Sequence, residues 1–524
     1  MKEISKEKQL LINMAASLCS CLVSFAVSLM ITPIIIADRG ISATGYINIA
    51  NNFSEFAAIA AMALNSMAGR FITIKIHQKD FKSANEYFNS IMYANFAIVA
   101  ALLLPCILIV SRLEYIITLN DSISASMISD VKLLFAFTFF NFMVTIISTT
   151  FSTATFAKNR VDLQSIRTIE ANLLKAAVLF ALFYFLPVKI YFVAIATLIM
   201  TLYLFVTYLH YTKKLLPEIQ IGWKFFRLQK VLDILSAGIW NTIMRSGQVL
   251  TNSLDTMIAN KALGSDEGGY VATAKTIATA VNMLYETIAA VFSPALTITY
   301  ASGSKEDLLK ELRSAMKLTG FFANIPLCFV IAFGLPFYTI WLSNAKNITN
   351  TGTIQIIYIL TVLTMFGTIV GGTISPLFNV FTVVNKVKWN SIAVLIMGVL
   401  STAIVLSFVT VSPEYGIYAI VGVSSFLGII KNVTFTPMYA AHCLGIKKTA
   451  FHPAILRYVL VSIAMALVFI GFQKMIPTTN WFVLFLDILL CGVTGSLLNY
   501  FFLFEKRERE LFTSIVGNMI KRIK

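Results

Sequence analysis

Residues 10–36 read LLINMAASLCSCLVSFAVSLMITPIII, a run of 27 side chains without a single charge. A helix that crosses a membrane needs ~20 mostly apolar residues, so this run predicts one membrane span. The run is too long for the apolar region of a secretory signal peptide, and no small-residue cleavage site leads into a soluble domain. We therefore expect it to be retained as the first of several spans.

The rest of the chain repeats this pattern. Of its 524 residues, 58% are apolar and only 13% are charged, whereas a soluble chain has roughly 45–50% and about 25%. This composition excludes a soluble enzyme, a nucleic-acid binder and a disordered scaffold. It predicts an all-α polytopic membrane protein with about 14 transmembrane helices. Further spans are expected at residues 44–68, 89–110, 132–156, 171–187, 190–210, 235–260, 269–300, 318–342, 354–382, 391–411, 417–438, 454–473 and 481–503.

The positive charges give the predicted orientation. The net charge is +16, with 41 Lys and Arg against 25 Asp and Glu. With fourteen spans, 31 of these cations fall on the side of the two termini, 7 on the opposite side and 3 inside spans. Basic residues favour the cytoplasmic side of a membrane. Both termini are therefore expected to be cytoplasmic, and an odd number of spans would destroy the asymmetry.

No motif for a metal, a cofactor or catalysis is found. The four histidines are scattered, and the six cysteines lack metal-ligand spacing, so neither a zinc site nor a disulfide framework is expected. There is no GxxxxGK[ST] motif, so we expect no built-in ATPase. The basic tail at 504–524 and the loops at 79–90 and 304–316 read as short amphipathic helices on the inner surface.

The chain also contains a weak internal repeat. The run Asn89-Ser-Ile-Met lies 224 residues before Arg313-Ser-Ala-Met, and each follows a charged loop after an even-numbered span. Two six-helix lobes related by a pseudo-twofold axis along the membrane normal are therefore predicted. Their expected bounds are 1–212 and 213–450, with two additional spans in 451–503 and a cytoplasmic amphipathic tail at 504–524.

Polar side chains follow three of the predicted spans at helical spacing, which places each set on one face. Charged side chains within a membrane are costly and usually face a cavity or one another. We expect a solvated, substrate-handling cavity here; structural polar contacts between helices are the alternative. The stripes comprise Asn48, Asn52 and Glu55; Asn241, Arg245, Gln248, Asn252 and Asp255; and Lys275, Thr279, Asn282 and Glu286.

Other polar positions are less informative. Ser17, Ser24 and Ser28 share one face of the first span. Lys175, one turn inside the fifth predicted span, is interpreted as reaching back to the interface. Asp487 is left unassigned. Gly367, Gly371, Gly372 and Pro376 make the tenth span a possible hinge.

The repeat, the polar spans and the run Asn65-Ser-Met-Ala-Gly-Arg-Phe, followed by Ala84-Asn-Glu-Tyr-Phe-Asn, resemble the multidrug/oligosaccharidyl-lipid/polysaccharide (MOP) flippase superfamily. Within it, the chain is similar to polysaccharide transporters of the O-antigen flippase (Wzx) type. The resemblance implies a flippase that moves a polyprenyl-pyrophosphate-linked oligosaccharide of polysaccharide or lipopolysaccharide biosynthesis to the outer leaflet. It also implies a bacterial inner membrane location, and polysaccharide polymerase and chain-length proteins as partners beside the lipids, with no nucleic acid.

The resemblance assigns roles to the stripes. Arg245 is expected to contact the pyrophosphate, because a guanidinium matches phosphate oxygens. The sugar is expected on the neighbouring polar side chains, and ion coupling on the carboxylates. The expected substrate-binding residues are thus Arg245, Lys275, Asn48, Asn52, Asn241, Gln248, Asn252 and Asn282, and the ion-coupling residues are Glu55, Asp255 and Glu286.

Two other transport functions stay open. A cation-coupled multidrug or metabolite antiporter of the same superfamily would suit the carboxylates, but Arg245 would repel a cationic substrate. Lipid II flippases carry arginines in their first two spans, whereas this chain has only Arg70, at the inner edge of the second. A membrane-embedded enzyme is not expected, because the longest predicted outer loop, 111–131, holds no paired catalytic groups.

Overall fold

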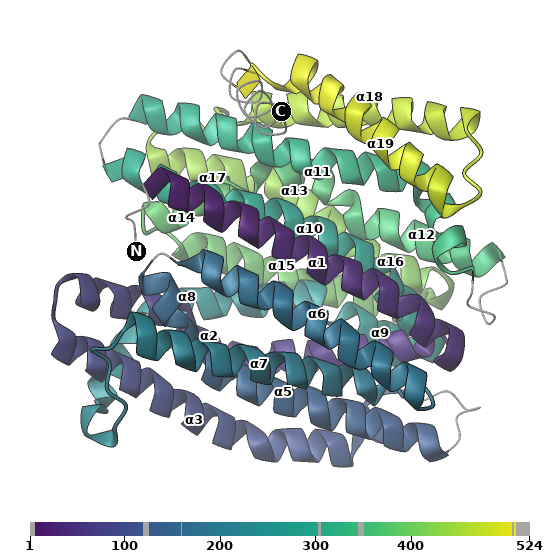
Figure 1. The fold of residues 1–524 in the computed structure, drawn as a ribbon. Helices are drawn as coiled ribbons and strands as arrows, with labels where there is room; N and C mark the ends of the chain where they lie inside the picture. The colour runs from purple at the N-terminus through teal and green to yellow at the C-terminus, as the bar shows by residue number, and fades with distance from the viewer. Residues whose placement is uncertain are drawn as a thin grey trace, which may run out of the picture. The chain divides into compact units, whose positions relative to one another are not determined.

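The computed structural model describes residues 6–118, 125–158, 160–301, 305–343, 351–505 and 508–509. These residues form helices and short connections, without a strand among them (Figure 1). The predicted tail at 504–524 lies outside the described residues except for positions 504, 505, 508 and 509. The all-α fold class predicted from composition is confirmed.

Twelve helices in the described residues are long and apolar enough to cross a membrane. They correspond to all the predicted spans except the seventh and the eighth, which coincide with α8 and α9 and with α10, respectively. Together the twelve helices and these two are consistent with about fourteen spans.

The chain divides into two compact units. Unit 1 comprises Met1–Thr273 and Lys388–Ile420, and unit 2 comprises Ala274–Val387 and Val421–Lys524. Two of the three boundaries fall inside long helices, α10 and α16, so each of these helices contributes to both units; the third lies between α14 and α15. The lobe boundaries predicted at residues 212 and 450 stay a prediction.

Unit 1 is a layer of long helices around an apolar core that includes Tyr46, Phe135 and Phe139. The helix α5 packs on α2 and α7, α1 packs on α6, and α8 lies between α2 and α15 (Figure 1). The bounds are α1 Lys6–Arg39, α2 Ser42–His77, α3 Phe81–Ser111, α4 Leu113–Ile116, α5 Ala125–Ala157, α6 Val161–Phe185, α7 Tyr191–Leu215, η1 Trp223–Phe225, α8 Leu228–Asn252, α9 Asp255–Ala262, α10 Ser265–Ala301, α15 Lys388–Val411 and α16 Pro413–Val433.

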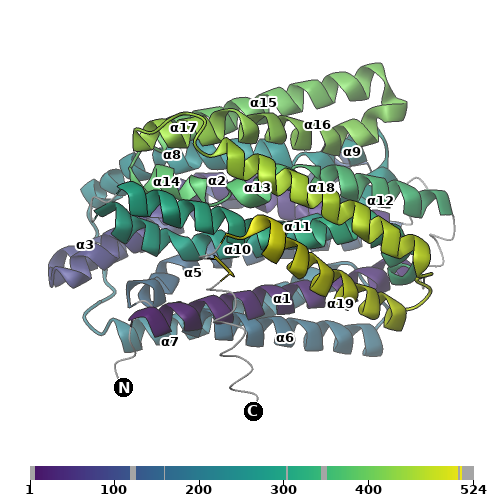
Figure 2. The same ribbon diagram turned by 90° about the horizontal axis from the view of Figure 1, so that it is seen from above.

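Unit 2 is built around α11, which contacts α12, α13, α18 and α19; Figure 2 shows α18 and α19 running alongside it. Its apolar core includes Leu312, Met316, Phe381 and Phe451. The bounds are α11 Lys305–Trp341, α12 Thr351–Phe366, α13 Thr368–Ile374, α14 Leu377–Val383, α17 Phe435–Leu444, α18 His452–Met475, α19 Trp481–Leu498 and the π-helical turn η3 Asn499–Leu503.

Several predicted spans are interrupted. The seventh breaks between α8 and α9 just before Asp255, and the tenth breaks into α12, α13 and α14 around Gly367 and Pro376. In the tenth span, a Cβ added to Gly372 would lie 2.3 Å from the Cβ of Ala323 and 2.8 Å from the hydroxyl of Tyr458. This glycine therefore permits close helix packing, an explanation that the hinge interpretation did not include.

The loops at 79–90 and 304–316 were predicted to be short amphipathic helices; their residues from 81 and from 305 are helical, but they are the first turns of long helices. The helix α3 begins at Phe81 and α11 at Lys305, and both continue through the membrane-spanning run. Asp80 caps α3 by accepting a hydrogen bond from the Ser83 amide at 3.1 Å. Hydrogen bonds from Ser83 also hold the pKa of this carboxyl below its usual value.

Two residues separated by the offset of the predicted repeat are in contact, while the repeat itself stays a prediction. Thr44 at the start of α2 donates to the carbonyl of Gly269 on α10, at 3.3 Å, and the two residues are 225 positions apart. A Cβ on Gly45 would lie 2.9 Å from the Gly269 nitrogen, so equivalent ends of the second and eighth spans meet closely.

The repeated motif Asn89-Ser90 and Arg313-Ser314 also has a structural role. Ser90 donates to the carbonyl of Arg227 and accepts from its amide, which fixes the segment after α7 against α3. Asn89 holds the same segment by donating to the Gln220 carbonyl and accepting from the Gly222 amide. Ser314, at the equivalent position of α11, instead binds the segment after α19 through Glu508.

Candidate functional site

A polar seam runs along the contact between α2 and α8–α9 inside unit 1. We define the α2–α8 seam by Asn48, Asn52, Glu55 and Ser66 on one side and Asn241, Arg245, Gln248 and Thr256 on the other. The two helices run antiparallel. They approach closely because Gly238 of α8 has no Cβ, and an added Cβ would collide with the carbonyl of Ala63. Small residues of this kind let helix backbones meet in a membrane.

An ion pair occupies the middle of this seam. The Arg245 guanidinium contacts the Glu55 carboxylate, and its other terminal nitrogen donates to Gln248 at 3.5 Å. The two charged side chains retain 33% and 42% of their exposure, so other residues of the chain do not fully cover the pair.

Amide side chains continue the seam on both sides of the ion pair. Asn48 accepts from Asn52 at 3.0 Å and from the Thr256 hydroxyl at 2.7 Å. At the other end, Asn241 donates to the hydroxyl of Ser66 at 3.2 Å. The seam therefore offers a row of hydrogen-bonding groups of the kind that sugar hydroxyls require, beside one cation and one anion.

The depth of the ion pair follows from helix geometry. Glu55 lies 13 residues after the first residue of α2, or ~20 Å at ~1.5 Å per residue. The hydrocarbon layer is ~30 Å thick, so the pair is placed well inside it. Ionisable groups at such a depth are rare outside functional sites.

The predicted residues are divided between the two units. Lys275, Asn282 and Glu286 lie on the part of α10 that belongs to unit 2, with Glu286 exposed and the other two half-buried. Asp255 does not continue the α8 stripe on one straight helix, because it begins α9 after the break, where it is buried. Asn252 is the last residue of α8. The roles given to all of these side chains remain untested.

The serine face of the first span makes hydrogen bonds to α6 and within α1. Ser17 hydrogen-bonds Ser165 of α6 at 3.1 Å, and Asn172 of α6 donates to Ser24 at 2.9 Å. Ser28 donates to the carbonyl of Ser24 within its own helix. These contacts join α1 to α6, which is the structural alternative stated for polar stripes.

Sequence reasoning placed the start of the fifth span too late. It was expected at residue 171, but α6 begins at Val161 because the polar residues before 171 still follow the helical period. As a result Arg167 and Glu170 lie inside the span, where they form an ion pair that also contacts Tyr203 of α7. The spacing of three between Arg167 and Glu170 could have indicated this pair.

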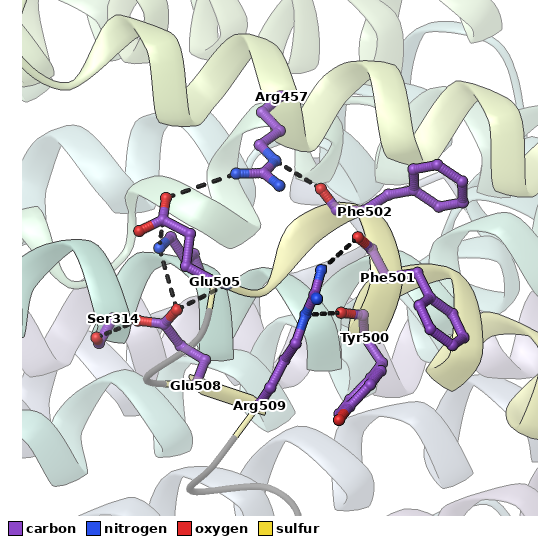
Figure 3. A network of polar contacts seen from close by, with 9 residues as sticks. Ser314, Arg457, Tyr500, Phe501, Phe502, Glu505, Glu508 and Arg509 are labelled. Carbon is purple, nitrogen blue, oxygen red and sulfur yellow. Dashed lines mark hydrogen bonds and ion pairs between the residues drawn. The ribbon is translucent and has the colours of Figure 1, made fainter.

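A second polar network that sequence reasoning missed lies at the C-terminal end of α19 (Figure 3). Glu508 is 2% exposed and accepts hydrogen bonds from Ser314 and, at 3.1 Å, from Lys317 of α11. Glu505 contacts Lys317 at 3.0 Å and Arg457 of α18 at 3.5 Å. The network therefore joins the segment after α19 to two other helices of unit 2.

Two arginines in the same network cap the last turn of this helix (Figure 3). Arg509 donates to the carbonyls of Tyr500 and Phe501 at 2.9 and 2.8 Å, and Arg457 donates to that of Phe502 at 2.5 Å. Carbonyls at a helix C-terminus lack partners within the helix and carry partial negative charge, so guanidinium groups are suitable partners.

Solved transporter structures share this fold. The lipid II flippase MurJ, in an inward closed conformation, aligns with a TM-score of 0.65 at 14% identity, covering 94% of this chain and 99% of that chain. The MATE multidrug transporter DinF-BH aligns with a TM-score of 0.65 at 14% identity over 85% of this chain and 99% of its own. An outward-facing MATE transporter of the MOP superfamily aligns with a TM-score of 0.57 at 14% identity, covering 84% and 97% of the two chains.

The chain is thus a polytopic helical membrane protein with the fold of MOP-superfamily flippases and transporters. At the level of sequence, it is 26% identical over 507 residues to the uncharacterized membrane protein EpsK of Bacillus subtilis (strain 168), an alignment that covers 95% of this chain and 96% of that protein. No family model matches the sequence.

Proposed function

We propose that this protein is a flippase that carries a polyprenyl-pyrophosphate-linked oligosaccharide from the inner to the outer leaflet of a bacterial cell membrane by alternating access. The observation that supports this most is Arg245, a permanent cation inside the membrane, half-exposed and set in a row of asparagine and glutamine amides. A guanidinium suits the pyrophosphate and the amides suit the sugar. Both termini are proposed to be cytoplasmic.

The substrate explains why a sideways-open path is needed. A polyprenyl tail gains ~0.8 kcal/mol for each CH₂ that stays in lipid, so it cannot be carried through water. Only the charged head has to cross. Outward movement of its negative charge is favoured by an inside-negative potential by ~2.3 kcal/mol per charge per 100 mV.

Two alternatives in the same fold have specific support. A cation-coupled multidrug or metabolite antiporter is favoured by the half-exposed Glu55 carboxylate and by the MATE-like fold. A lipid II flippase is favoured by the similarity to MurJ. Against the antiporter, Arg245 neutralises Glu55 and would repel a cation at the same place.

Reconstituted protein should distinguish these substrates. In proteoliposomes, we expect a fluorescent polyprenyl-pyrophosphate oligosaccharide to become accessible to an impermeant quencher on the opposite leaflet, faster with an imposed potential. The same vesicles are tested with lipid II and with a cationic dye. Transport of the dye alone would establish the antiporter, and movement of lipid II alone would establish the lipid II flippase.

Ion coupling is proposed for Glu55, Asp255 and Glu286. We expect that at least one of the neutral variants Glu55→Gln, Asp255→Asn and Glu286→Gln loses most translocation in these vesicles, because a bound proton or cation needs a carboxylate. The measurement is the initial rate with and without an imposed ion gradient. Three variants with wild-type rates in both conditions would show that these groups do not couple ions.

Polysaccharide polymerase and chain-length proteins are proposed as partners, since the translocated unit must be polymerised after it crosses. Neither a cofactor nor a metal enters this proposal.

A further inference from the structure

Lys175 lies near the middle of the membrane, deeper than the sequence indicated. The contacts between α1 and α6 set its depth, because Asn172 bonds Ser24 and the Arg39 guanidinium bonds the carbonyl of Val188. Ser24 is at the centre of the uncharged run 10–36. Lys175 is three residues beyond Asn172, or ~5 Å from that centre.

This depth argues against the interpretation that Lys175 reaches back to the inner interface. Lys175 lies 14 residues after the first residue of α6, or ~21 Å along the helix. Half of the hydrocarbon layer is ~15 Å thick, which exceeds the length of a lysine side chain. Its ammonium group therefore has to be accommodated within the membrane.

The face of α6 that carries Lys175 is turned into unit 1. Ala171 and Leu179, four residues before and after it, are both 0% exposed. Residues four apart lie on the same side of a helix, so Lys175 projects between two fully covered positions. The lysine itself is half-buried, which leaves part of its side chain accessible.

Lys175 has no carboxylate within ion-pair distance in the described part of the chain. Other cations of α6 and its neighbours do: Arg167 pairs with Glu170, and Lys189 pairs with Asp130 at 3.1 Å. The neighbouring amide of Asn172 is also occupied, since it donates to Ser24 and to the Thr168 carbonyl. An uncompensated cation at this depth costs roughly 2.5–3.5 kcal/mol on insertion scales.

We propose that Lys175 is a phosphate-binding residue of unit 1, which holds the pyrophosphate of the lipid-linked substrate. This inference rests on the proposed flippase function. It assigns the substrate anion a second cationic side chain of unit 1, besides Arg245. An ammonium group offers three donors and a compact positive charge, which is how lysine binds phosphate. Because Arg245 is paired with Glu55, Lys175 can accept the anion without first breaking an ion pair.

The test is a binding titration with the full-length protein in nanodiscs of neutral lipid. The probe is polyprenyl pyrophosphate, and phosphatidylglycerol is titrated in parallel as the alternative source of phosphate. Lys175→Gln removes the charge, Lys175→Arg keeps it, and Lys214→Gln removes one exposed charge from the end of α7 as the matched control. Thermal unfolding of each variant shows whether it is folded.

We expect Lys175→Gln to bind polyprenyl pyrophosphate at least about tenfold more weakly, the loss of one charge-assisted hydrogen bond. Lys175→Arg should stay within about threefold of wild type, and Lys214→Gln should equal it. Wild-type affinity of a folded Lys175→Gln variant would overturn the inference without contradicting the proposed flippase function. Partial unfolding of that variant, with unchanged affinity of its folded fraction, would do the same. Equal, Lys175-dependent binding of phosphatidylglycerol would assign the site to phospholipid headgroups. Failure of the wild type to bind polyprenyl pyrophosphate would instead reject the proposed function.

Discussion

Replacing Arg245 by alanine is expected to lower the rate of translocation by about 100-fold or more. The change removes a guanidinium that can make two charge-assisted hydrogen bonds to a pyrophosphate, each worth roughly 1.5–3 kcal/mol. It also leaves the Glu55 carboxylate without its partner, which adds repulsion against the anionic substrate. The measurement is the initial rate in proteoliposomes, supported by the level of surface polysaccharide in a complemented strain.

Two further variants separate a transport role from a structural one. Arg245→Lys should retain part of the activity, since the charge remains while the forked geometry is lost. The double variant Arg245→Ala with Glu55→Gln removes both members of the ion pair. If expression falls in Arg245→Ala and the double variant restores both expression and transport, the arginine is only a structural partner of Glu55. Restored expression without transport is the result that the proposal requires.

Glu508→Gln is expected to lower the free energy of unfolding by about 3 kcal/mol. The carboxylate is 2% exposed and bonds Ser314 and Lys317, and the lysine is itself only 6% exposed. Removing one member of a buried pair costs roughly 3–5 kcal/mol, and Glu505 retains one contact to Lys317, so the lower end applies. The midpoint of thermal unfolding of the purified protein measures the loss.

Glu306→Gln is the matched control on the same helix. Glu306 pairs with Lys310 at 2.9 Å, but its side chain is 82% exposed. Its neutralisation should change the unfolding midpoint little, because exposed ion pairs contribute at most about 1 kcal/mol. An equal shift in both variants would contradict the view that burial gives the Glu508 network its strength.

The same network gives a pH dependence with a definite sign. Burial raises the pKa of the Glu508 carboxyl, but the hydrogen bond from Ser314 and the charge of Lys317 outweigh burial and hold the pKa below its ordinary value. A carboxyl with a lower pKa in the folded state stabilises the fold above its unfolded pKa of about 4.3. That stabilisation is lost as the pH falls through the folded value, so the difference between Glu508→Gln and wild type should shrink under acid conditions.

The sequence alone predicted the membrane class, the number of spans and the residues Glu55 and Arg245 as unusual. These follow from local composition, because a bilayer demands ~20 apolar residues per crossing and penalises each charge within it. Element ends were less predictable. The fifth span began ten residues early, since a helix continues through polar residues when neighbouring helices supply partners, as α7 does for Arg167 and Glu170.

Only the tertiary structure decided which polar groups meet. The same periodic spacing placed Arg245 and Ser24 on stripes, yet one is paired with a carboxylate in an accessible seam and the other joins two helices. The tertiary structure also placed Lys175 away from the inner interface, and it showed that the buried Glu508 joins the segment after α19 to α11. Periodicity fixes the face of a helix on which a side chain lies, whereas the partner on the facing helix depends on packing between segments up to about two hundred residues apart.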